Sequence, residues 1–563
     1  MRRKTQAFVV LILVLSAVTF GGWLANSTTT IDPDLYVTLR KNITLFQRIY
    51  EEISVRYVDE VDPEAFIKAG IEGMTDRLDP YTNFVEQEEN ENLRTVTEGK
   101  YGGVGMNIMR KGNSVIVAEP PYDGTPAAKA GIREGDQIFE VEEEETSKMR
   151  LAEVAQRLRG KPGTAVKIRV KRASETGLLE FRLVRAMITV HDVTYSDLME
   201  GDIGYIRLIR FSRFAAEQLE EALADLTRRG MKGLILDLRS NTGGLLNAAV
   251  NVADLFLPEG DLIVYTKGRS DRANMKYYSK NAPLLGDLPM VVVVNELSAS
   301  ASEIVAGAIQ DLDRGLIIGS KTYGKGLVQT VVPFSQNAAL RLTTAKYYVP
   351  SGRLIQDLAQ LNRDAQIFAH QDDELTPDSS SASSLKEFRT KAGRLVFGGG
   401  GIKPDIEFEP PKRSSYEISL LRQSMFFNFA ISYSSQTSSS LEDLEMDKSL
   451  IEEFRSYLAA SDFEFKLEGE DEINELEKIA GERSFGPELE AHLAATRESL
   501  DQIKENEFDN HLPFIRRNLR REIAAKLFGS RGQVEATRKD DPVFQTALEV
   551  LTNPAEYAMK LGQ

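Results

Sequence analysis

Four consecutive valines, Val291 to Val294, constrain this fold more than any other feature of the chain. A strand with one solvated face alternates apolar and polar residues, so an unbroken apolar run predicts a strand that is buried on both faces. Between about residues 200 and 410, further short apolar runs alternate with segments of helical spacing. This alternation is typical of the α/β class. The sequence therefore predicts an α/β core around the four valines.

Composition limits the chemistry that such a core can perform. The 563 residues are 42% hydrophobic, and a prior of ~150 residues per domain suggests three or four domains. Acidic residues outnumber basic ones by 85 to 69, giving a net charge of −16, which argues against nucleic-acid binding. The chain has no cysteine, so a thiol nucleophile, a disulfide framework and cysteine-ligated metals are excluded.

Histidine is almost as scarce as cysteine. Four histidines are present, and no two of them lie close together in the sequence: His191, His370, His492 and His511. A multi-histidine metal site and an HExxH helix are therefore not expected. We expect no metal site and no cofactor, and any hydrolytic chemistry has to proceed without cysteine and without histidine.

The N-terminus is predicted to be a targeting segment. Three basic residues, Arg2 to Lys4, precede an uncharged run from Ala7 to Ala25 that is about as long as a membrane's hydrocarbon core requires. We expect residues 1–26 to be an uncleaved membrane anchor. The alternative is a cleaved signal peptide, for which Leu24-Ala25-Asn26 is a weak cleavage site. Either way, the rest of the chain is expected to be exported.

The remaining chain divides by pattern into four stretches. Residues 33–98 have helical spacing, and residues 99–188 contain short β-rich runs. The α/β stretch covers 189–410 and includes a Ser-rich segment at 375–385, which is expected to be an exposed excursion. Residues 411–563 are mostly helical and highly charged, with an amphipathic face at Leu512, Ile515, Leu519, Ile523 and Leu527. This tail is either a packed helical domain or a docking surface for another subunit or an adaptor.

Two segments in the β-rich stretch resemble a PDZ domain. Residues 101–106, YGGVGM, resemble the carboxylate-binding loop, in which glycine frees successive backbone N–H groups to bind a peptide's C-terminal carboxylate. Residues 126–138, PAAKAGIREGDQI, match the family pattern of a helix that ends before a Gly-Asp turn into a strand. The resemblance implies that the peptide is bound by Gly102, Gly103, Val104 and Gly105.

The segment after the four valines contains three serines: Ser298, Ser300 and Ser302. Helical spacing follows from Ile304, so these serines lie at a strand-to-helix turn, where a hydroxyl is exposed and helix amides stabilise a nearby anion. The same residues have a structural explanation, because Ser300-x-x-Glu303 is also a capping box. These residues alone leave both interpretations open.

A second candidate segment follows the next apolar strand. Residues 319–325 fit the first seven positions of a phosphate-binding loop, GxxxxGK. The eighth position must be Ser or Thr to reach Mg²⁺, but here it is Gly326, and no helix is indicated after it. Nucleotide binding is therefore not expected, and Lys325 by itself would be interpreted as a solvated loop lysine.

Together the two segments resemble the carboxy-terminal processing proteases, also called tail-specific proteases. The motifs are SASASEIVAGAIQD and GSKTYGKGLVQ, with LDPYT (78–82), IGYIR (203–207), LDLRSNTGG (236–244), YYVPSGR (347–353) and GGIKPD (400–405). The resemblance implies an α/β multidomain fold with a crotonase/Clp-protease-like protease core. The expected division is an anchor (1–26), an N-terminal helical arm (33–98), an inserted PDZ domain (99–188), the protease core (189–410) and an α-helical extension (411–563). The core would be partly continuous with the arm.

The resemblance also implies catalytic roles. By motif position, Ser300 is the nucleophile, Lys325 is the general base and Gln329 orients the lysine, while Glu303 is a possible accessory residue. A lysine base has to be neutral, so we expect burial to lower the pKa of Lys325.

The oxyanion hole needs two backbone donors. The amide of Ala301, next to the nucleophile, is one candidate. The family position of the second is Gly243, with Gly244 as a close alternative.

The implied activity is endoproteolysis near the C-terminus of a protein substrate. The PDZ domain would hold the free C-terminus and could gate the site. Expected partners are peptides with free C-termini, the membrane, and a second copy or an adaptor at the tail, with no nucleic acid. The expected location is the bacterial periplasm or cell envelope, anchored in the inner membrane. The alternatives are a non-catalytic membrane-anchored PDZ scaffold and a small-molecule esterase or amidase.

Overall fold

The computed structural model describes residues 33–86, 99–122, 124–172, 175, 177–334, 338–356, 386–409, 412–434, 444, 446–461, 463–483 and 486–562. The anchor expected at 1–26 and the excursion expected at 375–385 lie outside these residues. Within the described part of the chain, no helix combines the length and apolarity that crossing a membrane requires. The chain separates into two compact units, one up to Leu78 and one from Asp79 onward. The five-part division stays a prediction.

The first unit is a pair of helices, α2 (Pro33–Arg56) and α3 (Pro63–Thr75). Asp62 is the N-cap of α3, and its side chain accepts hydrogen bonds from the amides of Glu64 and Ala65. The two helices are linked by Tyr50, whose hydroxyl donates to the carbonyl of Pro63 at 2.8 Å and whose ring stacks on Phe66. The helical spacing expected in the first part of this stretch is therefore confirmed by the helices α2 and α3.

The second unit begins with a turn and a strand instead of further helix. The side chain of Asp79 accepts hydrogen bonds from the amides of Tyr81 and Thr82. This turn leads into β1 (Asn83–Glu86), so the helical spacing stops at the break that Asp79-Pro80 indicates in the sequence, and a strand follows within the stretch 33–98 expected to be a helical arm.

The region resembling a PDZ domain contains two small sheets. The larger has the strand order β3-β4-β5-β7-β8, with β6 paired to β5, and the smaller pairs β2 with β9. The strands are β2 (Lys100–Gly103), β3 (Ile108–Lys111), β4 (Ser114–Val117), β5 (Gln137–Val141), β6 (Glu144–Glu145), β7 (Ala165–Lys171), β8 (Leu178–Val184) and β9 (Ala186–Thr189). The helices α5 (Pro126–Lys129) and α6 (Leu151–Leu158) contribute Ala127, Val154 and Leu158 to the core of this region.

A central sheet contains the four valines and has the order β10-β11-β12-β15-β16-β21. Its strands are β10 (Val193–Met199), β11 (Ile203–Leu208), β12 (Gly233–Asp237), β15 (Met290–Val294), β16 (Leu316–Gly319) and β21 (Ile406–Glu407). All neighbours are parallel except β10, which pairs antiparallel with β11 at one edge. Every residue of β12 and β15 is buried, which confirms the strand buried on both faces.

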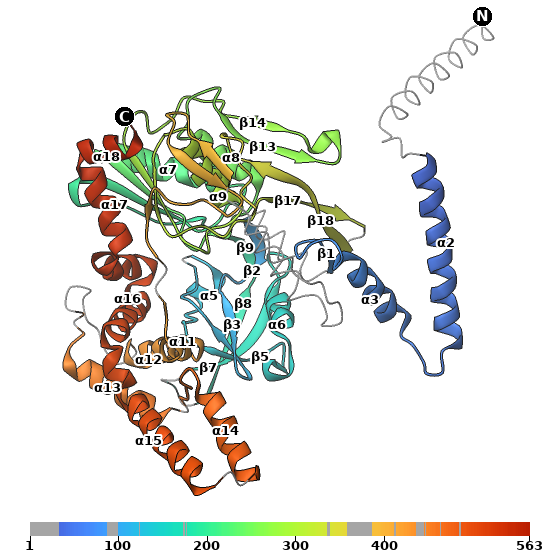
Figure 1. Ribbon diagram of the computed structural model, residues 1–563, viewed down its shortest axis with the longest axis vertical. Helices are drawn as coiled ribbons and strands as arrows, with labels where there is room; N and C mark the ends of the chain where they lie inside the picture. Colours follow the sequence, from blue (N-terminus) through green and yellow to red (C-terminus); the bar gives the residue numbers. More distant parts are fainter. Residues whose placement is uncertain are drawn as a thin grey trace, which may run out of the picture. The chain divides into compact units, whose positions relative to one another are not determined.

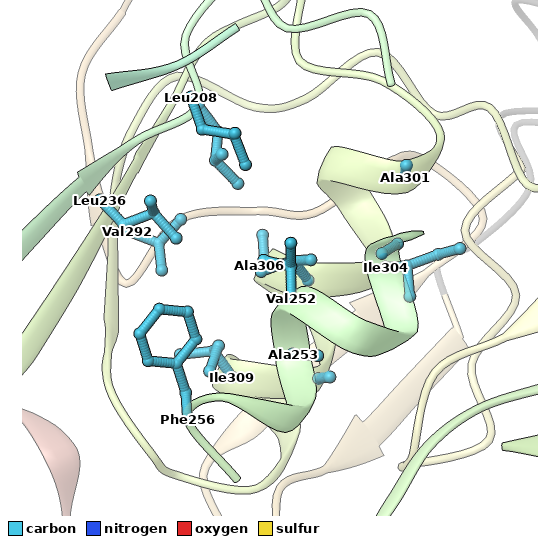
Figure 2. Close-up of a cluster of buried hydrophobic side chains, with 14 of the residues drawn as sticks. Leu208, Leu236, Val252, Ala253, Phe256, Val292, Ala301, Ile304, Ala306 and Ile309 are labelled. Atoms are coloured by element: carbon cyan, nitrogen blue, oxygen red, sulfur yellow. The ribbon is translucent and has the colours of Figure 1, made fainter. Parts of the chain in front are cut away.

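Three helices cover one face of the central sheet: α7 (Ala215–Arg228), α8 (Leu246–Asp254) and α9 (Ala301–Asp311). Figure 2 shows the cluster in which side chains from α8 and α9 meet residues of the strands. Val292 and Leu236 point from the sheet toward this cluster, and Val252 and Ile309 point into it from the helices. The apolar face of the sheet is thereby removed from water.

The other face of the central sheet is covered by the C-terminal end of the chain. The helix α17 (Pro542–Thr552) packs against β12, β15 and β16, and α18 (Pro554–Leu561) packs against β16. Figure 1 shows both helices in red near the C-terminus. Val291 and Val293 share a buried cluster with Phe544 and Leu551. Tyr557 also exchanges two hydrogen bonds with the backbone of Met290, at 3.0 and 3.1 Å. This end of the tail is therefore a packed part of the core.

The rest of the tail contains six helices. They are α11 (Ser415–Arg422), α12 (Met425–Ser434), α13 (Lys448–Ala460), α14 (Glu470–Arg483), α15 (Pro487–Asn510) and α16 (Leu512–Thr537). Five of them, all except α14, contribute buried side chains to a separate apolar core. The amphipathic face predicted for this stretch is confirmed, because Ile515, Leu519 and Ile523 are fully buried in that core.

The tail also contacts the region resembling a PDZ domain. The ammonium group of Lys526 on α16 forms a buried ion pair with Glu134 and lies over the ring of Phe427. Burial raises the pKa of Glu134 to about 7, although Lys526 opposes this shift. Next to Glu134, Gly135 has a φ of +80° and packs directly against Ile431 of α12.

A second sheet carries the segment that fits a phosphate-binding loop. It has the order β1-β18-β13-β14, with β17 paired to β18: β13 (Leu262–Gly268), β14 (Lys276–Tyr278), β17 (Leu327–Pro333) and β18 (Ala338–Tyr348). The separate hairpin is β19 (Lys386–Arg389) and β20 (Leu395–Gly398). Since a strand and not a helix follows Lys325, the helix N-terminus that binds phosphate is missing, as expected.

The packing of α17 on the central sheet leads to a stability prediction. Replacing Phe544 by alanine should lower the free energy of unfolding by about 3–5 kcal/mol, because the side chain is buried and lies 5.4 Å from the ring of Tyr205. Urea unfolding followed by circular dichroism measures the change. As a control from the same tail, Leu476→Ala should change stability by less than about 0.5 kcal/mol, because Leu476 is 54% exposed. Equal losses in the two variants would contradict the packing role of α17.

Candidate active site

Ser300 lies between β15 and α9 in an unusual backbone conformation. Its φ and ψ are +56° and −112°, whereas a helix N-cap is normally extended. Such strain persists only where surrounding structure enforces it, and it is typical of a nucleophile held on a sharp strand-to-helix turn. The capping explanation accounts for the amide of Ser300, which donates to Glu303, but not for this conformation.

The structure distinguishes Ser300 from the two neighbouring serines. Ser298 donates its hydroxyl to the carbonyl of Leu238, and Ser302 donates to the carbonyl of Asn241, both at 2.8 Å. Both serines are fully buried. The hydroxyl of Ser300 donates to none of the residues that the structure describes. Ser298 and Ser302 therefore act as structural ties around Ser300.

Lys325 is held by two residues of this site. Its ammonium group donates to Oε1 of Gln329 at 3.3 Å and lies 4.6 Å from the ring centre of Tyr81. Gln329 is fixed in turn, because its amide nitrogen donates to the carbonyl of Tyr81 at 3.1 Å. The structure thus brings the two predicted residues Lys325 and Gln329 into direct contact.

The surroundings of Lys325 favour its neutral form. Burial lowers the pKa of Lys325, and the positive charge of Arg341 lowers it further. The carboxylates of Glu303 and Asp79 oppose the shift but do not reverse it. Lys325 is therefore not the solvated loop lysine that its position in the sequence suggests.

Glu303 connects the Ser300 turn to the Lys325 loop. Its carboxylate accepts hydrogen bonds from the amides of Ser300 (2.8 Å), Lys325 (2.9 Å) and Gly324 (2.7 Å), and from the hydroxyl of Thr322 (2.6 Å). The side chain is completely buried. Burial raises the pKa of Glu303, while these four hydrogen bonds act in the opposite direction. A single carboxylate thus ties both segments together.

Tyr347 of β18 makes a second connection between the same segments. Its hydroxyl lies within hydrogen-bonding distance of the carbonyls of Ser300 (3.1 Å) and Lys325 (2.5 Å), and it donates its one proton to either. The ring is 1% exposed, so water does not compete for these contacts. Ser300 and Lys325 are therefore joined through their backbones, and no hydrogen bond links their side chains in this structure.

The glycine turn after β12 lies directly against Ser300. Gly243 has a φ of +102°, and a Cβ placed there would lie 2.9 Å from Cβ of Ser300 and from the amide nitrogen of Ala301. Only glycine permits this approach. The amide of Gly243 donates to Oδ1 of Asn241 at 2.9 Å, whereas the amide of Gly244 has no acceptor among the described residues. The structure therefore brings the expected oxyanion residues together and leaves Gly244 the freer donor.

The predicted peptide-binding loop is partly strand. Gly102 and Gly103 belong to β2, which pairs antiparallel with β9. The close approach of the Gly160 carbonyl to Gly102 leaves no room for a Cβ there. Val104 is buried, and Gly105 has a φ of +80°. The loop therefore leads from a paired strand into the turn before β3.

Sequence reasoning gave no role to several residues of this site. Tyr81 lies in the LDPYT motif and Tyr347 in the YYVPSGR motif, so both positions carried a signal without a function. Asn241 lies in the LDLRSNTGG motif, again without an assigned function, whereas Arg341 lies in none of the quoted motifs. Across the described residues, no group of three or more His, Asp and Glu side chains is arranged to hold a metal ion.

Comparison with family models finds three matches along the chain. Residues 202–367 match peptidase family S41, residues 117–172 match the PDZ domain, and residues 416–551 match a model described as a probable PDZ-protease, C-terminal helical domain. The third match covers most of the tail, from α11 to α17.

Curated proteins that are similar in sequence to this chain are named as carboxy-terminal processing proteases. The chain is 40% identical over 322 residues to a carboxy-terminal-processing protease of Bartonella bacilliformis, covering 56% of this chain and 73% of that one. It is 39% identical over 294 residues to a carboxyl-terminal-processing protease of Synechocystis, covering 51% and 68%. A solved photosystem II D1 C-terminal processing protease is 28% identical over 65% of this chain and 87% of its own, with a TM-score of 0.35.

The electrostatics of the site generate a prediction for Lys325. Replacing Arg341 by glutamine removes a nearby positive charge, so the pKa of Lys325 should rise toward its ordinary value. NMR of the side-chain signals of labelled lysine across pH measures the change. A pKa of Lys325 that stays constant or falls in the variant would contradict the proposed influence of Arg341.

Proposed function

Since the chain belongs to the carboxy-terminal processing proteases of peptidase family S41, we propose that it cleaves proteins near their C-termini with Ser300 as nucleophile and Lys325 as general base. The observation that carries this proposal is the pair of backbone ties through Glu303 and Tyr347, which hold the Ser300 turn against the Lys325 loop. A serine hydroxyl attacks poorly unless a base removes its proton, and a lysine desolvated by burial can serve as that base.

The proposed reaction begins when the hydroxyl oxygen of Ser300 attacks the carbonyl carbon of the scissile bond. Neutral Lys325 accepts the hydroxyl proton and later gives it to the leaving amine. Gln329 meanwhile holds the side-chain nitrogen of Lys325 in place. Water then attacks the ester carbon of the acyl-enzyme, and Lys325 passes the water proton back to Ser300. Because the base must be neutral, turnover should rise as pH increases through the pKa of Lys325.

The negative oxygen of the tetrahedral intermediate needs two donors. The amide of Ala301 is at the first position of α9, where no intrahelical acceptor exists. The Gly243–Gly244 turn supplies the second donor in this proposal, since it packs against Ser300 and the amide of Gly244 has no acceptor among the residues that the structure describes.

We assign substrate selection to the PDZ domain. Its strand β3 lies at one edge of the larger sheet, so an extended peptide can add to it as a further strand. The loop from Gly102 to Gly105 would then bind the terminal carboxylate of that peptide. In this proposal the domain presents upstream residues to Ser300, and its occupancy gates the site.

The chain is proposed to act in the cell envelope, anchored by residues 1–26, because of the uncharged run from Ala7 to Ala25.

The catalytic assignment is tested by substitution. Ser300→Ala and Lys325→Ala should each lower the rate of casein cleavage by at least about a thousandfold while leaving the circular dichroism spectrum unchanged. Ser298→Ala and Ser302→Ala are matched controls, because they remove neighbouring hydroxyls that bind buried carbonyls. They should lower stability, and cleavage should fall far less than in Ser300→Ala, because neither hydroxyl takes part in the proposed reaction. Undiminished cleavage by Ser300→Ala would refute the assignment, and an inactive wild type would favour the non-catalytic PDZ scaffold.

The role of the PDZ domain is tested with two peptides of the same sequence, one ending in a free carboxylate and one amidated. The free form should be cleaved more efficiently, by about tenfold or more in kcat/KM, because an amide cannot replace the carboxylate in the loop. Gly105→Ala should reduce this preference, since a Cβ at Gly105 would lie 2.4 Å from Thr125.

Gly112→Ala is the matched control for Gly105→Ala. Gly112 also has a positive φ, of +55°, but nothing lies within 4 Å of its Cβ position. The preference for the free carboxylate should therefore survive in Gly112→Ala. Equal cleavage of the two peptides by the unsubstituted protein would exclude recognition of the terminal carboxylate.

A further inference from the structure

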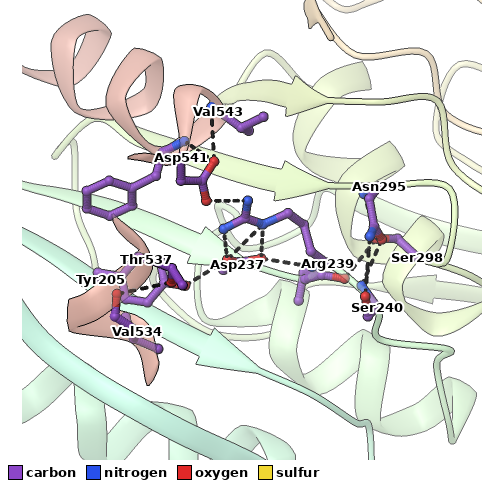
Figure 3. Close-up of polar contacts among 12 residues, drawn as sticks. Tyr205, Asp237, Arg239, Ser240, Asn295, Ser298, Val534, Thr537, Asp541 and Val543 are labelled. Carbon is purple, nitrogen blue, oxygen red and sulfur yellow. Dashed lines mark hydrogen bonds and ion pairs between the residues drawn. The ribbon is translucent and has the colours of Figure 1, made fainter. Parts of the chain in front are cut away.

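The C-terminal tail reaches the glycine turn beside Ser300 through one ion pair. Asp541 is the N-cap of α17, and its Oδ1 accepts hydrogen bonds from the amides of Val543 (3.1 Å) and Phe544 (3.2 Å). Its Oδ2 accepts a hydrogen bond from Nη1 of Arg239 at 2.6 Å, as Figure 3 shows. One carboxylate therefore connects the start of α17 to the loop that follows β12.

The guanidinium group of Arg239 is held from its other side as well. Its Nε and Nη2 donate to the carboxylate of Asp237, the last residue of β12, at 2.6 to 3.1 Å. Tyr205 donates its hydroxyl to the same carboxylate at 2.7 Å, and its ring contacts Phe544 of α17. Arg239 thus lies between a carboxylate of the sheet and a carboxylate of the tail (Figure 3).

Arg239 is also the first residue of the segment that leads to the turn. The next residue, Ser240, has a φ of +60° and donates its amide to Oδ1 of Asn295, at the end of β15, at 2.8 Å. Asn241 accepts the amide of Gly243, and Gly243 packs against Ser300. A continuous set of contacts therefore runs from Asp541 to the backbone next to the proposed nucleophile.

We propose that Asp541 is a positioning residue: by holding Arg239, it sets the place of the Ser240–Gly244 turn relative to Ser300. The inference rests on the proposed function, in which this turn supplies an oxyanion donor. Asp541 touches neither substrate nor nucleophile and acts through Arg239. The tail then has a part in turnover in addition to covering the sheet, because donors that are displaced from the developing charge stabilise it less.

Asp541 has a second role that the test must separate from the first. As the N-cap of α17 it stabilises the helix, and aspartate and asparagine are about equally good at this position. Asp541→Asn therefore keeps an N-cap acceptor and removes the negative charge that pairs with Arg239. Asp541→Ser also caps the helix but is too short to reach Arg239, so it gives a second test of the same contact.

A matched control comes from another ion pair between the tail and the core. Arg538, three residues before Asp541, lies 3.6 Å from the carboxylate of Glu200, and its side chain is 24% exposed, close to the 20% of Asp541. This pair does not lead to the glycine turn. Arg538→Gln should therefore weaken the docking of the tail without affecting the turn.

The experiment measures two quantities on the full chain. The first is hydrogen exchange of the peptide covering residues 238–245, followed by mass spectrometry, which does not depend on activity. The second is kcat and KM for a peptide with a free C-terminus. In Asp541→Asn and Asp541→Ser, exchange in this peptide should become faster, and kcat should fall by about tenfold or more with KM unchanged. Arg538→Gln should change neither quantity.

Each other outcome overturns the inference. Unchanged exchange in both Asp541 variants would mean that Asp541 does not hold the turn. Faster exchange with unchanged kcat would mean that the position of the turn does not limit turnover, and equal effects in Arg538→Gln would reduce the role of Asp541 to general docking. Failure of the proposed function is seen separately, because the unsubstituted protein would then not cleave the peptide, or Ser300→Ala would cleave it equally well.

Discussion

The structure depends on a sheet whose central strands are apolar on both faces. A layer of helices on one side would leave Val291 and Val293 in water, so a second layer is required. The chain supplies the first layer from the helices between the strands and the second from its C-terminal end. Because parallel strands end at the same edge, the same sheet also brings the segment after β12 and the segment after β15 together. The sheet that requires two covering layers of helices is therefore also the sheet that assembles the candidate site.

The candidate site is organised by buried polar groups rather than by contact between the two side chains proposed to react, Ser300 and Lys325. Glu303 accepts hydrogen bonds from amides of both segments, and the Tyr347 hydroxyl lies within hydrogen-bonding distance of a carbonyl of each. The two backbones are therefore joined without a hydrogen bond between the side chains of Ser300 and Lys325. A buried carboxylate is stable only when its lone pairs are satisfied, and here four donors satisfy them. Desolvation then acts on Lys325 in the direction that a general base requires.

Much of this arrangement could be predicted, and what could not be predicted has identifiable reasons. The unbroken valine run indicated the buried strand, and the missing Ser or Thr after Lys325 excluded a phosphate-binding loop. The pattern Ser300-x-x-Glu303 was ambiguous, because a capping serine and an exposed reactive serine both occur at a strand-to-helix turn. Local spacing did not indicate that Glu303 also reaches Lys325 and Thr322, because those contacts join residues distant in the sequence. Tyr347 could not be identified as a site residue for the same reason, since its contacts with Ser300 and Lys325 also join residues distant in the sequence.

The sequence by itself determined the α/β class, the region resembling a PDZ domain and the candidate residues Ser300, Lys325 and Gln329, because periodicity and motif spacing are local properties of the chain. Only the tertiary structure decided where the tail goes. Its amphipathic pattern requires an apolar partner but does not specify which one. The answer lies in Phe544 against Tyr205 and in Asp541 against Arg239, pairs separated by hundreds of residues. Local spacing does not specify these pairs, because their members meet only when α17 packs on the second face of the sheet.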